Sequence, residues 1–262
     1  MTKRVVAIAD LHCGHRAGLT PPEWQANPNN PEDAKWAEQQ KEMWNWYYAT
    51  IKRLRPIHWL LVCGDCVDGK AKLSESRDSL TTRRKRQVNM ALTAIDLCKA
   101  EKIEMTYGTR YHVNDWEEDI CSSLGDKAHI GAHGLVGVNG VLFDLKHKVG
   151  RSDSPQGRYT AIAKEELWNL VWSEDKQWPR ADWLLRAHVH YSVMARKVVG
   201  QRAIWGVVLP CLQGWGSEYG AEQCSGTINN GLFVWDISSK GGVAWHDERA
   251  VLECQKGQIR TE

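Results

Sequence analysis

Short apolar runs followed by aspartate or histidine constrain the fold of this chain more than any other sequence feature. Runs such as 5–9 and 59–63 are brief and are followed by Asp or Gly, which is typical of buried strands in a mixed or parallel sheet. The residues at or just after five such strand ends are Asp10 and His12, Asp65 and Asp68, His112, His147, and His188 and His190. Because strand ends of an α/β sheet meet at one edge, where ligands bind, we expect these side chains to lie close together.

Helical patterns separate the predicted strands. Residues 33–54 and 80–100 carry apolar side chains three to four positions apart, and a third helix is expected near 159–173. Further strands are predicted at 138–146, 182–187, 193–199, 203–209 and 231–237. Helices and strands alternate in the first half and strands dominate the last third. This order predicts an α/β fold, with a two-sheet β-sandwich flanked by helices.

Length and composition narrow the class of protein. The 262 residues contain no repeat and no linker, so one domain spanning 1–262 is expected. A net charge of +2 creates no global field for nucleic acid or membrane, and no run of 18 apolar residues could span a bilayer. Only five apolar residues follow Lys3 and Arg4, so we expect no signal peptide. The eight scattered cysteines favour reduced thiols in a cytoplasmic enzyme. Nothing indicates an oligomeric state.

The spacing of the polar side chains is consistent with a metal site. One residue separates Asp10 from His12, so an extended chain directs both side chains to the same side, and His188 and His190 share this spacing. Mixed imidazole and carboxylate ligands suit Zn, Fe or Mn better than Ca or Mg. A single Asp-x-His pair occurs by chance, and a lone histidine at a strand end is more often structural. The ordered set of five strand ends predicts metal binding.

This ordered set resembles the calcineurin-like metallophosphoesterase superfamily, whose pattern runs D-x-H, G-D-x-x-D/H, G-N-H-D/E, H and G-H-x-H. The resemblance covers residues 5–190. It implies a two-sheet β-sandwich with a dimetal centre at one end. It also implies that one ion is held by Asp10, His12, Asp65 and His190, and that a second, to which Asp65 bridges, is held by His147 and His188.

The resemblance implies a metal-dependent phosphoesterase that hydrolyses phosphodiesters or phosphomonoesters. Two cations can share a hydroxide and clamp the phosphate for in-line attack. Manganese is the first choice, and Fe, Zn, Co and Ni are alternatives, since the same ligands accept them. The partner is a phosphate ester, either a small molecule or nucleic acid, and no membrane is expected. Specificity would depend on the loops 13–32, 66–79, 150–158 and 210–230.

The third motif departs from the family pattern, because Gly-Thr-Arg-Tyr-His at 108–112 replaces Gly-Asn-His. Thr109 aligns with the asparagine that ligates the second ion, and Arg110 aligns with the histidine that protonates the leaving group. We expect His112 to act instead, either as general acid or as replacement ligand. Asn114 is a less favoured substitute ligand. Arg110, whose planar guanidinium suits phosphate, is expected to bind the substrate. Some members encoded by viruses and prophages look similar here.

A second departure is Ala187, which stands where the last motif usually has glycine and is expected to change only local packing.

Two other functions stay open: a nuclease of the same superfamily acting on DNA or RNA, and a non-catalytic interaction scaffold. The basic run 83–86 is either a solvated face or a contact for a nucleic-acid backbone. Only about 70 residues follow His190, and we expect many of them in strands of the second sheet.

Other unusual residues have simpler interpretations. Cys63 and Cys66 are expected to pack around a strand end, because no second cysteine pair completes a zinc site. The chain has 14 tryptophans, most of which are expected in the core. Trp24 and Trp215 fall in predicted loops and could stack on a base or sugar.

Overall fold

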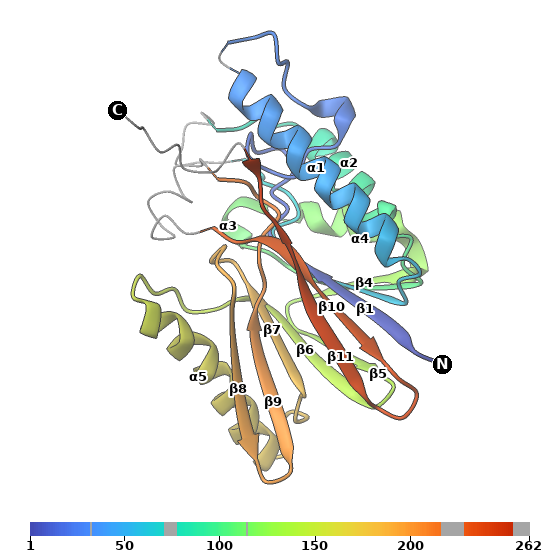
Figure 1. Cartoon of the computed structure of the whole chain (residues 1–262), viewed down its shortest axis with the longest axis vertical. Coiled ribbons are helices and arrows are strands. Elements are labelled where there is room, and N and C mark those ends of the chain that lie inside the picture. Colours follow the sequence, from blue (N-terminus) through green and yellow to red (C-terminus); the bar gives the residue numbers. More distant parts are fainter. Residues whose placement is uncertain (32, 71–77, 114, 216–227, 254–262) are drawn as a thin grey trace.

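The computed structural model describes residues 1–31, 33–70, 78–113, 115–215 and 228–253 (Figure 1). Its strands are β1 (Lys3–Ile8), β2 (Trp59–Cys63), β3 (Lys102–Thr106), β4 (Ala128–Gly131), β5 (Gly134–Val138), β6 (Val141–Lys148), β7 (Trp183–Ala187), β8 (Val193–Val199), β9 (Arg202–Val208), β10 (Asn230–Ile237) and β11 (Val243–Ala250). Its α-helices are α1 (Ala34–Leu54), α2 (Arg84–Leu97), α3 (Arg110–Val113), α4 (Trp116–Leu124) and α5 (Pro155–Glu174). Short 3-10 helices occupy Pro22–Trp24 and Gly125–Lys127.

Two mixed sheets form the centre of the fold. The first has the strand order β11-β10-β1-β2-β3-β4, in which β1 to β4 are parallel, β10 is antiparallel to β1, and β11 is antiparallel to β10. The second has the order β5-β6-β7-β9-β8, in which β6, β7 and β9 are parallel. Parallel neighbours end at the same edge of a sheet. The residues that follow β1, β2 and β3 therefore meet along one edge, as do those that end or follow β6 and β7.

The strands β1, β2 and β10 of the first sheet are buried on both faces, which explains their largely apolar sequences. Val5 and Ala7 face the second sheet, where they contact a cluster that includes Phe143. Val6 and Ile8 alternate with them and pack against the helices on the other side. Successive strand residues point to opposite faces, so a strand between two apolar layers needs apolar residues at every position.

Helices cover the two outer faces (Figure 1). α1, α2 and α4 lie over the first sheet, and α5 lies over the second. α1 buries Met43, Tyr47 and Ile51, which recur every four residues and so share one face of the helix. The result is a layered order of helices, sheet, sheet and helix. This confirms the predicted α/β fold class with two sheets flanked by helices, whereas the single domain spanning 1–262 stays a prediction.

The observed elements differ from the predicted ones in three ways. β10 and β11 belong to the first sheet, so the prediction that the region after His190 mainly extends the second sheet is wrong for this hairpin. α2 begins at Arg84 instead of residue 80. Sequence patterns missed β4, β5, β11 and α4. β4 is only four residues long, and in β11 no residue is fully buried, which leaves little apolar signal.

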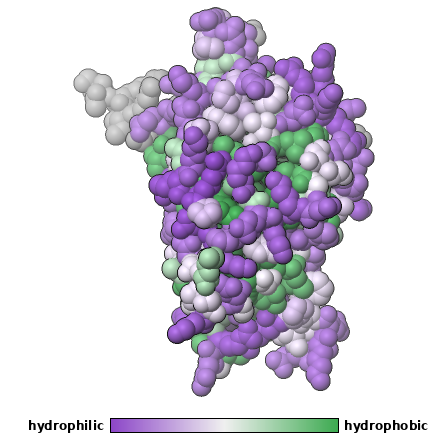
Figure 2. Space-filling model, turned by 90° about the vertical axis from the view of Figure 1, so that its right-hand side faces the viewer, coloured by the Kyte–Doolittle hydropathy of each residue, from purple (hydrophilic) through white to green (hydrophobic). Residues whose placement is uncertain are grey.

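Most apolar side chains lie in the core. The face shown in Figure 2 is largely hydrophilic, with apolar side chains visible only between polar ones. Cys63 and Cys66 are fully buried, as the packing interpretation predicted, and Cys13 and Cys98 are also fully buried. Cys224 and Cys254 lie outside the described ranges. Among the described helices, none is long and apolar enough to cross a bilayer.

Candidate metal centre

Strand ends from both sheets bring the six predicted metal ligands together in two neighbouring clusters. Asp10, His12 and His190 form the first cluster, and Asp65, His147 and His188 form the second. Within each cluster one nitrogen or oxygen atom per residue lies within 4.8 Å of the others. His188 is partly exposed and the other five are buried. The two clusters thus contain the six residues that the resemblance implied as ligands.

In the first cluster, the nitrogen and oxygen atoms that could bind a metal ion lie close together. His190 Nε2 lies 3.8 Å from Asp10 Oδ1, and the His12 and His190 rings are 5.1 Å apart in an edge-to-face arrangement. The backbone N–H of His188 donates to Asp10 Oδ2 at 3.1 Å. Asp10 Oδ1 is buried and accepts no hydrogen bond from the residues that the structure describes. A buried carboxylate oxygen normally has a hydrogen-bond or ionic partner, so this atom fits a metal ligand.

The Asp65 carboxylate lies between the clusters. Its Oδ2 is 3.0 Å from His147 Nε2 and 3.9 Å from His188 Nδ1 in the second cluster. The same oxygen is 3.9 Å from His12 Nε2 in the first. Asp65 is 1% exposed, so its charge is screened from water. A carboxylate in this place can face two cations at once, which a single imidazole nitrogen cannot do.

The backbone at the centre adopts a conformation that residues other than glycine rarely take. Five of the six ligands have positive φ: Asp10 (51°), His12 (44°), Asp65 (49°), His188 (79°) and His190 (56°). Each such residue costs on the order of 1 kcal/mol or more, and residues of this kind concentrate at functional sites. Positive φ turns the chain sharply just after β1, β2 and β7, which directs the ligands inward rather than along the strands.

Two glycines allow the loops after β2 and β3 to approach each other. Gly64 has a φ of +72°, and a Cβ there would lie 2.7 Å from His147 Nδ1 and 2.8 Å from the Cα of Gly108. A Cβ on Gly108 would overlap Asp65 Oδ1. Neither position has room for a larger residue, so both glycines of the sequence motifs are required for close packing.

Hydrogen bonds on the far side of two imidazole rings fix which nitrogen faces the cluster. His147 Nδ1 lies 2.8 Å from the carbonyl oxygen of Cys63, and His12 Nδ1 lies 3.3 Å from Asp68 Oδ1. Each contact leaves Nε2 directed into the centre. This arrangement of an outer acceptor behind a histidine is usual at metal sites, where it orients the ring. Asp68 therefore orients the His12 ring and is not itself a member of either cluster.

The electrostatic potential of the centre favours positive charge. Burial alone would lower the pKa of His147, but the Asp65 and Asp10 carboxylates outweigh burial and raise it to about 10. Burial raises the pKa of Asp10 above its usual value. A site that binds a proton this strongly also attracts a divalent cation, which would compete with that proton.

The third motif contributes Thr109 to the second cluster. The Thr109 N–H donates to Asp65 Oδ1 at 2.6 Å, and its hydroxyl oxygen lies 3.1 Å from both Asp65 Oδ2 and His147 Nε2. The sequence interpretation noted only that Thr109 replaces an asparagine, and it did not predict that Thr109 contacts the second cluster. The alignment of Thr109 with a metal-ligating asparagine could have indicated this contact.

The other residues of the motif are less fully described. Arg110 begins α3 and is exposed, at the border of a cavity of about 340 Å³ that Tyr107, Asp115 and Glu118 also line. The side chain of His112 and the whole of Asn114 lie outside the described residues. The roles expected for Arg110, His112 and Asn114 stay predictions.

Glu117 is a buried carboxylate that the sequence interpretation missed. It lies on α4 and is fully buried, and its Oε1 and Oε2 accept hydrogen bonds from the N–H groups of Cys66 (2.9 Å) and Gly108 (2.6 Å). Cys66 follows Asp65 and Gly108 precedes Thr109, so one side chain joins the two loops behind the second cluster. No sequence motif marks Glu117, since its partners are backbone groups.

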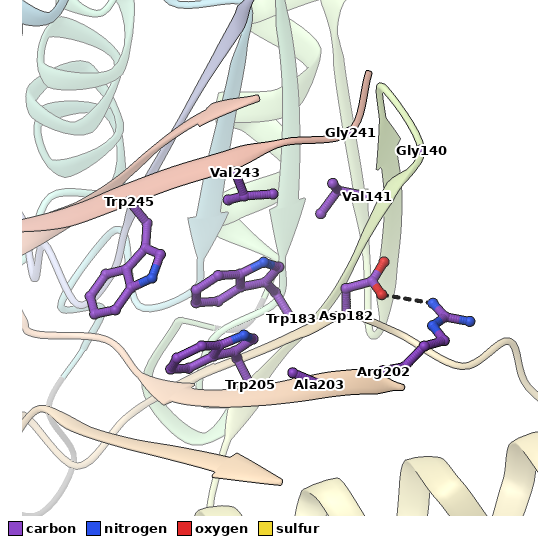
Figure 3. Close-up of a pocket in the computed structure, with 10 residues that line it drawn as sticks. All are labelled: Gly140, Val141, Asp182, Trp183, Arg202, Ala203, Trp205, Gly241, Val243 and Trp245. Atoms are coloured by element: carbon purple, nitrogen blue, oxygen red, sulfur yellow. Dashed lines mark hydrogen bonds and ion pairs between the residues drawn. The ribbon is translucent and has the colours of Figure 1, made fainter. Parts of the chain in front are cut away.

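A second cavity lies at the opposite ends of the strands (Figure 3). Its volume is about 610 Å³, and its lining includes Trp183, Trp205 and Trp245. Trp183 and Trp205 stack with ring centroids 5.2 Å apart, and Arg202 pairs with Asp182 at 2.7 Å. Trp183 begins β7, whereas the metal-ligand clusters follow the other end of that strand. None of the described residues that line this cavity is a histidine, and its indoles account for part of the tryptophan-rich core.

Comparisons with known proteins add distant likenesses in fold. No protein-family model matches the chain, and no curated protein matches its sequence. A structure of an archaeal phosphodiesterase aligns over 94% of this chain and 99% of its own, with 13% identity and a TM-score of 0.40. Vps29 of Chaetomium thermophilum aligns over 95% and 99%, with 11% identity and a TM-score of 0.42. The NAD nucleotidase NadN of Haemophilus influenzae, of which this chain spans 49%, has 8% identity and a TM-score of 0.41. The chemistry of the centre must be inferred from this chain's own side chains.

Proposed function

We propose that this chain is a metal-dependent phosphoesterase of the calcineurin-like type, which hydrolyses phosphodiesters or phosphomonoesters at a centre of two divalent ions. One observation carries the proposal: the Asp65 carboxylate lies between two Asp/His clusters that are buried except for His188, and its Oδ2 is 3.0 Å from His147 Nε2 and 3.9 Å from His12 Nε2. Binuclear hydrolases need two ions about 3.5–4 Å apart. A shared carboxylate is the simplest way to hold them there.

The donor atoms fit such a centre. Asp10, His12 and His190 would hold one ion and His147 and His188 the other, with Asp65 between. Imidazole and carboxylate donors suit Mn, Fe, Zn, Co and Ni, and we propose Mn as the first to test. When bound, the two ions supply positive charge that lowers the pKa of a water molecule and stabilises charge developing on the phosphate.

Two residues of the third motif are proposed to act on the substrate. Arg110 is exposed at the start of α3, immediately after Thr109, so its guanidinium can bind a phosphate oxygen beside the centre. His112, two residues further on, is proposed to donate a proton to the leaving-group oxygen. Arg110 would thus stabilise negative charge on the phosphate, and His112 would transfer the proton.

The alternative functions have less support. In the basic run, Arg84 makes ion pairs with Asp115 at 2.9 Å and Asp119 at 2.7 Å, so part of its charge is already balanced within the protein. This favours a small phosphate ester over nucleic acid. A non-catalytic scaffold would have no need of six converging ligands. The cytoplasmic location, the absence of a membrane partner and the likeness to virus- or prophage-encoded members remain predictions from the sequence.

The test is hydrolysis of bis-p-nitrophenyl phosphate and p-nitrophenyl phosphate by metal-stripped protein, to which Mn is added back in steps. We expect release of nitrophenol that needs Mn and saturates as a second ion binds. Hydrolysis of the diester alone would identify a phosphodiesterase or nuclease. No hydrolysis of either ester combined with no Mn binding would refute the proposal and favour the scaffold.

A further inference from the structure

The Thr109 hydroxyl lies at the centre of the second cluster. Its oxygen is 3.1 Å from Asp65 Oδ2, 3.1 Å from His147 Nε2 and 3.2 Å from His188 Nδ1. The residue is 7% exposed, and its N–H donates to Asp65 Oδ1 at 2.6 Å, which fixes the backbone beside the carboxylate. One neutral side chain therefore contacts all three donor atoms that would hold the second ion.

The groups around the hydroxyl can all direct lone pairs at one cation. An ionised carboxylate such as Asp65 only accepts hydrogen bonds. His147 Nδ1 lies 2.8 Å from the Cys63 carbonyl oxygen, which also only accepts, so Nδ1 keeps its proton and Nε2 presents a lone pair when the ring is neutral. A cation bound to Nε2 holds the ring in this neutral form, and the hydroxyl oxygen can direct a lone pair at the same ion.

The distances match those of donors around one ion. Donor atoms about 2.1 Å from an ion are about 3.0 Å apart at right angles and about 3.4 Å apart in a tetrahedron. The three Thr109 separations of 3.1, 3.1 and 3.2 Å fall in this interval. The Asp65–His147 separation of 3.0 Å lies at its lower end, and the Asp65–His188 separation of 3.9 Å is longer.

We infer that the Thr109 hydroxyl is the fourth protein donor to the second ion, an inference that rests on the proposed dimetal function. Thr109 then supplies the donor for which His112 or Asn114 was considered as a replacement. The second ion receives two imidazoles, a neutral hydroxyl and a carboxylate that it shares. The first ion receives the Asp10 carboxylate as well as its share of Asp65. The two ions therefore bind in sequence, the second more weakly.

The test compares Mn binding by wild type, Thr109→Val and Thr109→Ser, measured by isothermal titration calorimetry on the full chain after metal removal. Valine has nearly the same shape as threonine but no hydroxyl, and serine keeps the hydroxyl. We expect Thr109→Val to weaken the second Mn by about tenfold or more, a loss typical of changes at metal sites, while the first changes less than about threefold. Thr109→Ser should stay near wild type.

The outcomes separate this inference from the proposed function. Wild-type affinity for the second Mn in Thr109→Val would overturn the role of the hydroxyl and leave the dimetal proposal standing. Wild type that binds fewer than two Mn would overturn both. Thermal melting without metal checks that Thr109→Val is folded, and Thr109→Ala, which also lacks the hydroxyl, replaces it in the same comparison if it is not.

Discussion

Replacing Glu117 by glutamine tests how the loops behind the second cluster are held. Both carboxylate oxygens accept a backbone N–H, from Cys66 at 2.9 Å and from Gly108 at 2.6 Å. Glutamine keeps the shape but has a single acceptor oxygen, so its NH₂ group must face one of the two N–H groups. A buried N–H left without an acceptor costs about 1–3 kcal/mol. We expect Glu117→Gln to lose at most this much free energy of unfolding at pH 8, because removal of the buried Glu117 charge offsets part of the loss.

The effect should grow at lower pH. Burial raises the pKa of Glu117 to about 7, and the nearby Asp65 carboxylate adds to the rise. A group whose pKa is raised by folding stabilises the fold fully below its unfolded pKa of about 4.3, and this contribution is lost as the pH rises through about 7. The glutamine variant cannot take up this proton. The difference between wild type and Glu117→Gln should therefore be larger at pH 5, by up to about 3 kcal/mol.

The assay is urea unfolding of metal-free protein, followed by tryptophan fluorescence at pH 5 and pH 8. Glu166→Gln is the matched control, because Glu166 is also buried but accepts a single N–H, from Gly206 at 2.9 Å. Its amide oxygen can serve that donor, so we expect a loss below about 1 kcal/mol at pH 8. Burial also raises the pKa of Glu166, so its loss should likewise be larger at pH 5 than at pH 8. Equal losses in the two variants at pH 8, or a Glu117→Gln loss that does not depend on pH, would refute the reasoning.

Three further predictions concern other parts of the structure. Asp65→Asn removes the shared charge and should abolish Mn-dependent hydrolysis; near-normal turnover would contradict a shared ligand. His112→Ala should lower turnover by about 100-fold or more and His133→Ala far less, since the second histidine contacts Asp144 instead of the centre; equal effects would refute the proton-donor role. The pKa of Asp144 is about 2 despite burial, because His133 and Arg186 stabilise its charge. Arg186→Met removes the guanidinium partner of this carboxylate and should cost about 3–5 kcal/mol of unfolding free energy, measured with urea. A loss below about 1 kcal/mol would contradict the buried ion pair.

The clustering of the six candidate ligands and the fold class could be predicted because their signals are local. Each candidate ligand lies within a few residues of a strand end, and the strands are short apolar runs whose order indicates two sheets. The parallel strands of each sheet then bring these residues to one edge, and this does not depend on the conformation of the loops. The positive φ of Asp10, His12 and Asp65 could not be predicted, because it is imposed by the packing of strand ends and is unfavourable for those residue types.

The supporting residues were not predictable for a different reason. Glu117 contacts only backbone N–H groups, from residues 9 and 51 positions away, so no pattern of residue types marks it. Thr109 was recognised as a departure from the family motif, yet its place among three donor atoms depends on the turn after β3. The hairpin of β10 and β11 joined the first sheet because β10 pairs antiparallel with β1, a long-range contact that strand patterns do not indicate.

The most direct test of the proposed dimetal centre is electron paramagnetic resonance of the metal-stripped protein titrated with Mn²⁺. Two ions that shared the Asp65 carboxylate would lie about 3.5–4 Å apart and would interact magnetically. We predict that the simple six-line spectrum of an isolated ion at one equivalent gives way to the multiline spectrum of a coupled pair at two, and that Asp65→Asn prevents the change. A spectrum of isolated ions at two equivalents in the wild type would contradict the shared centre.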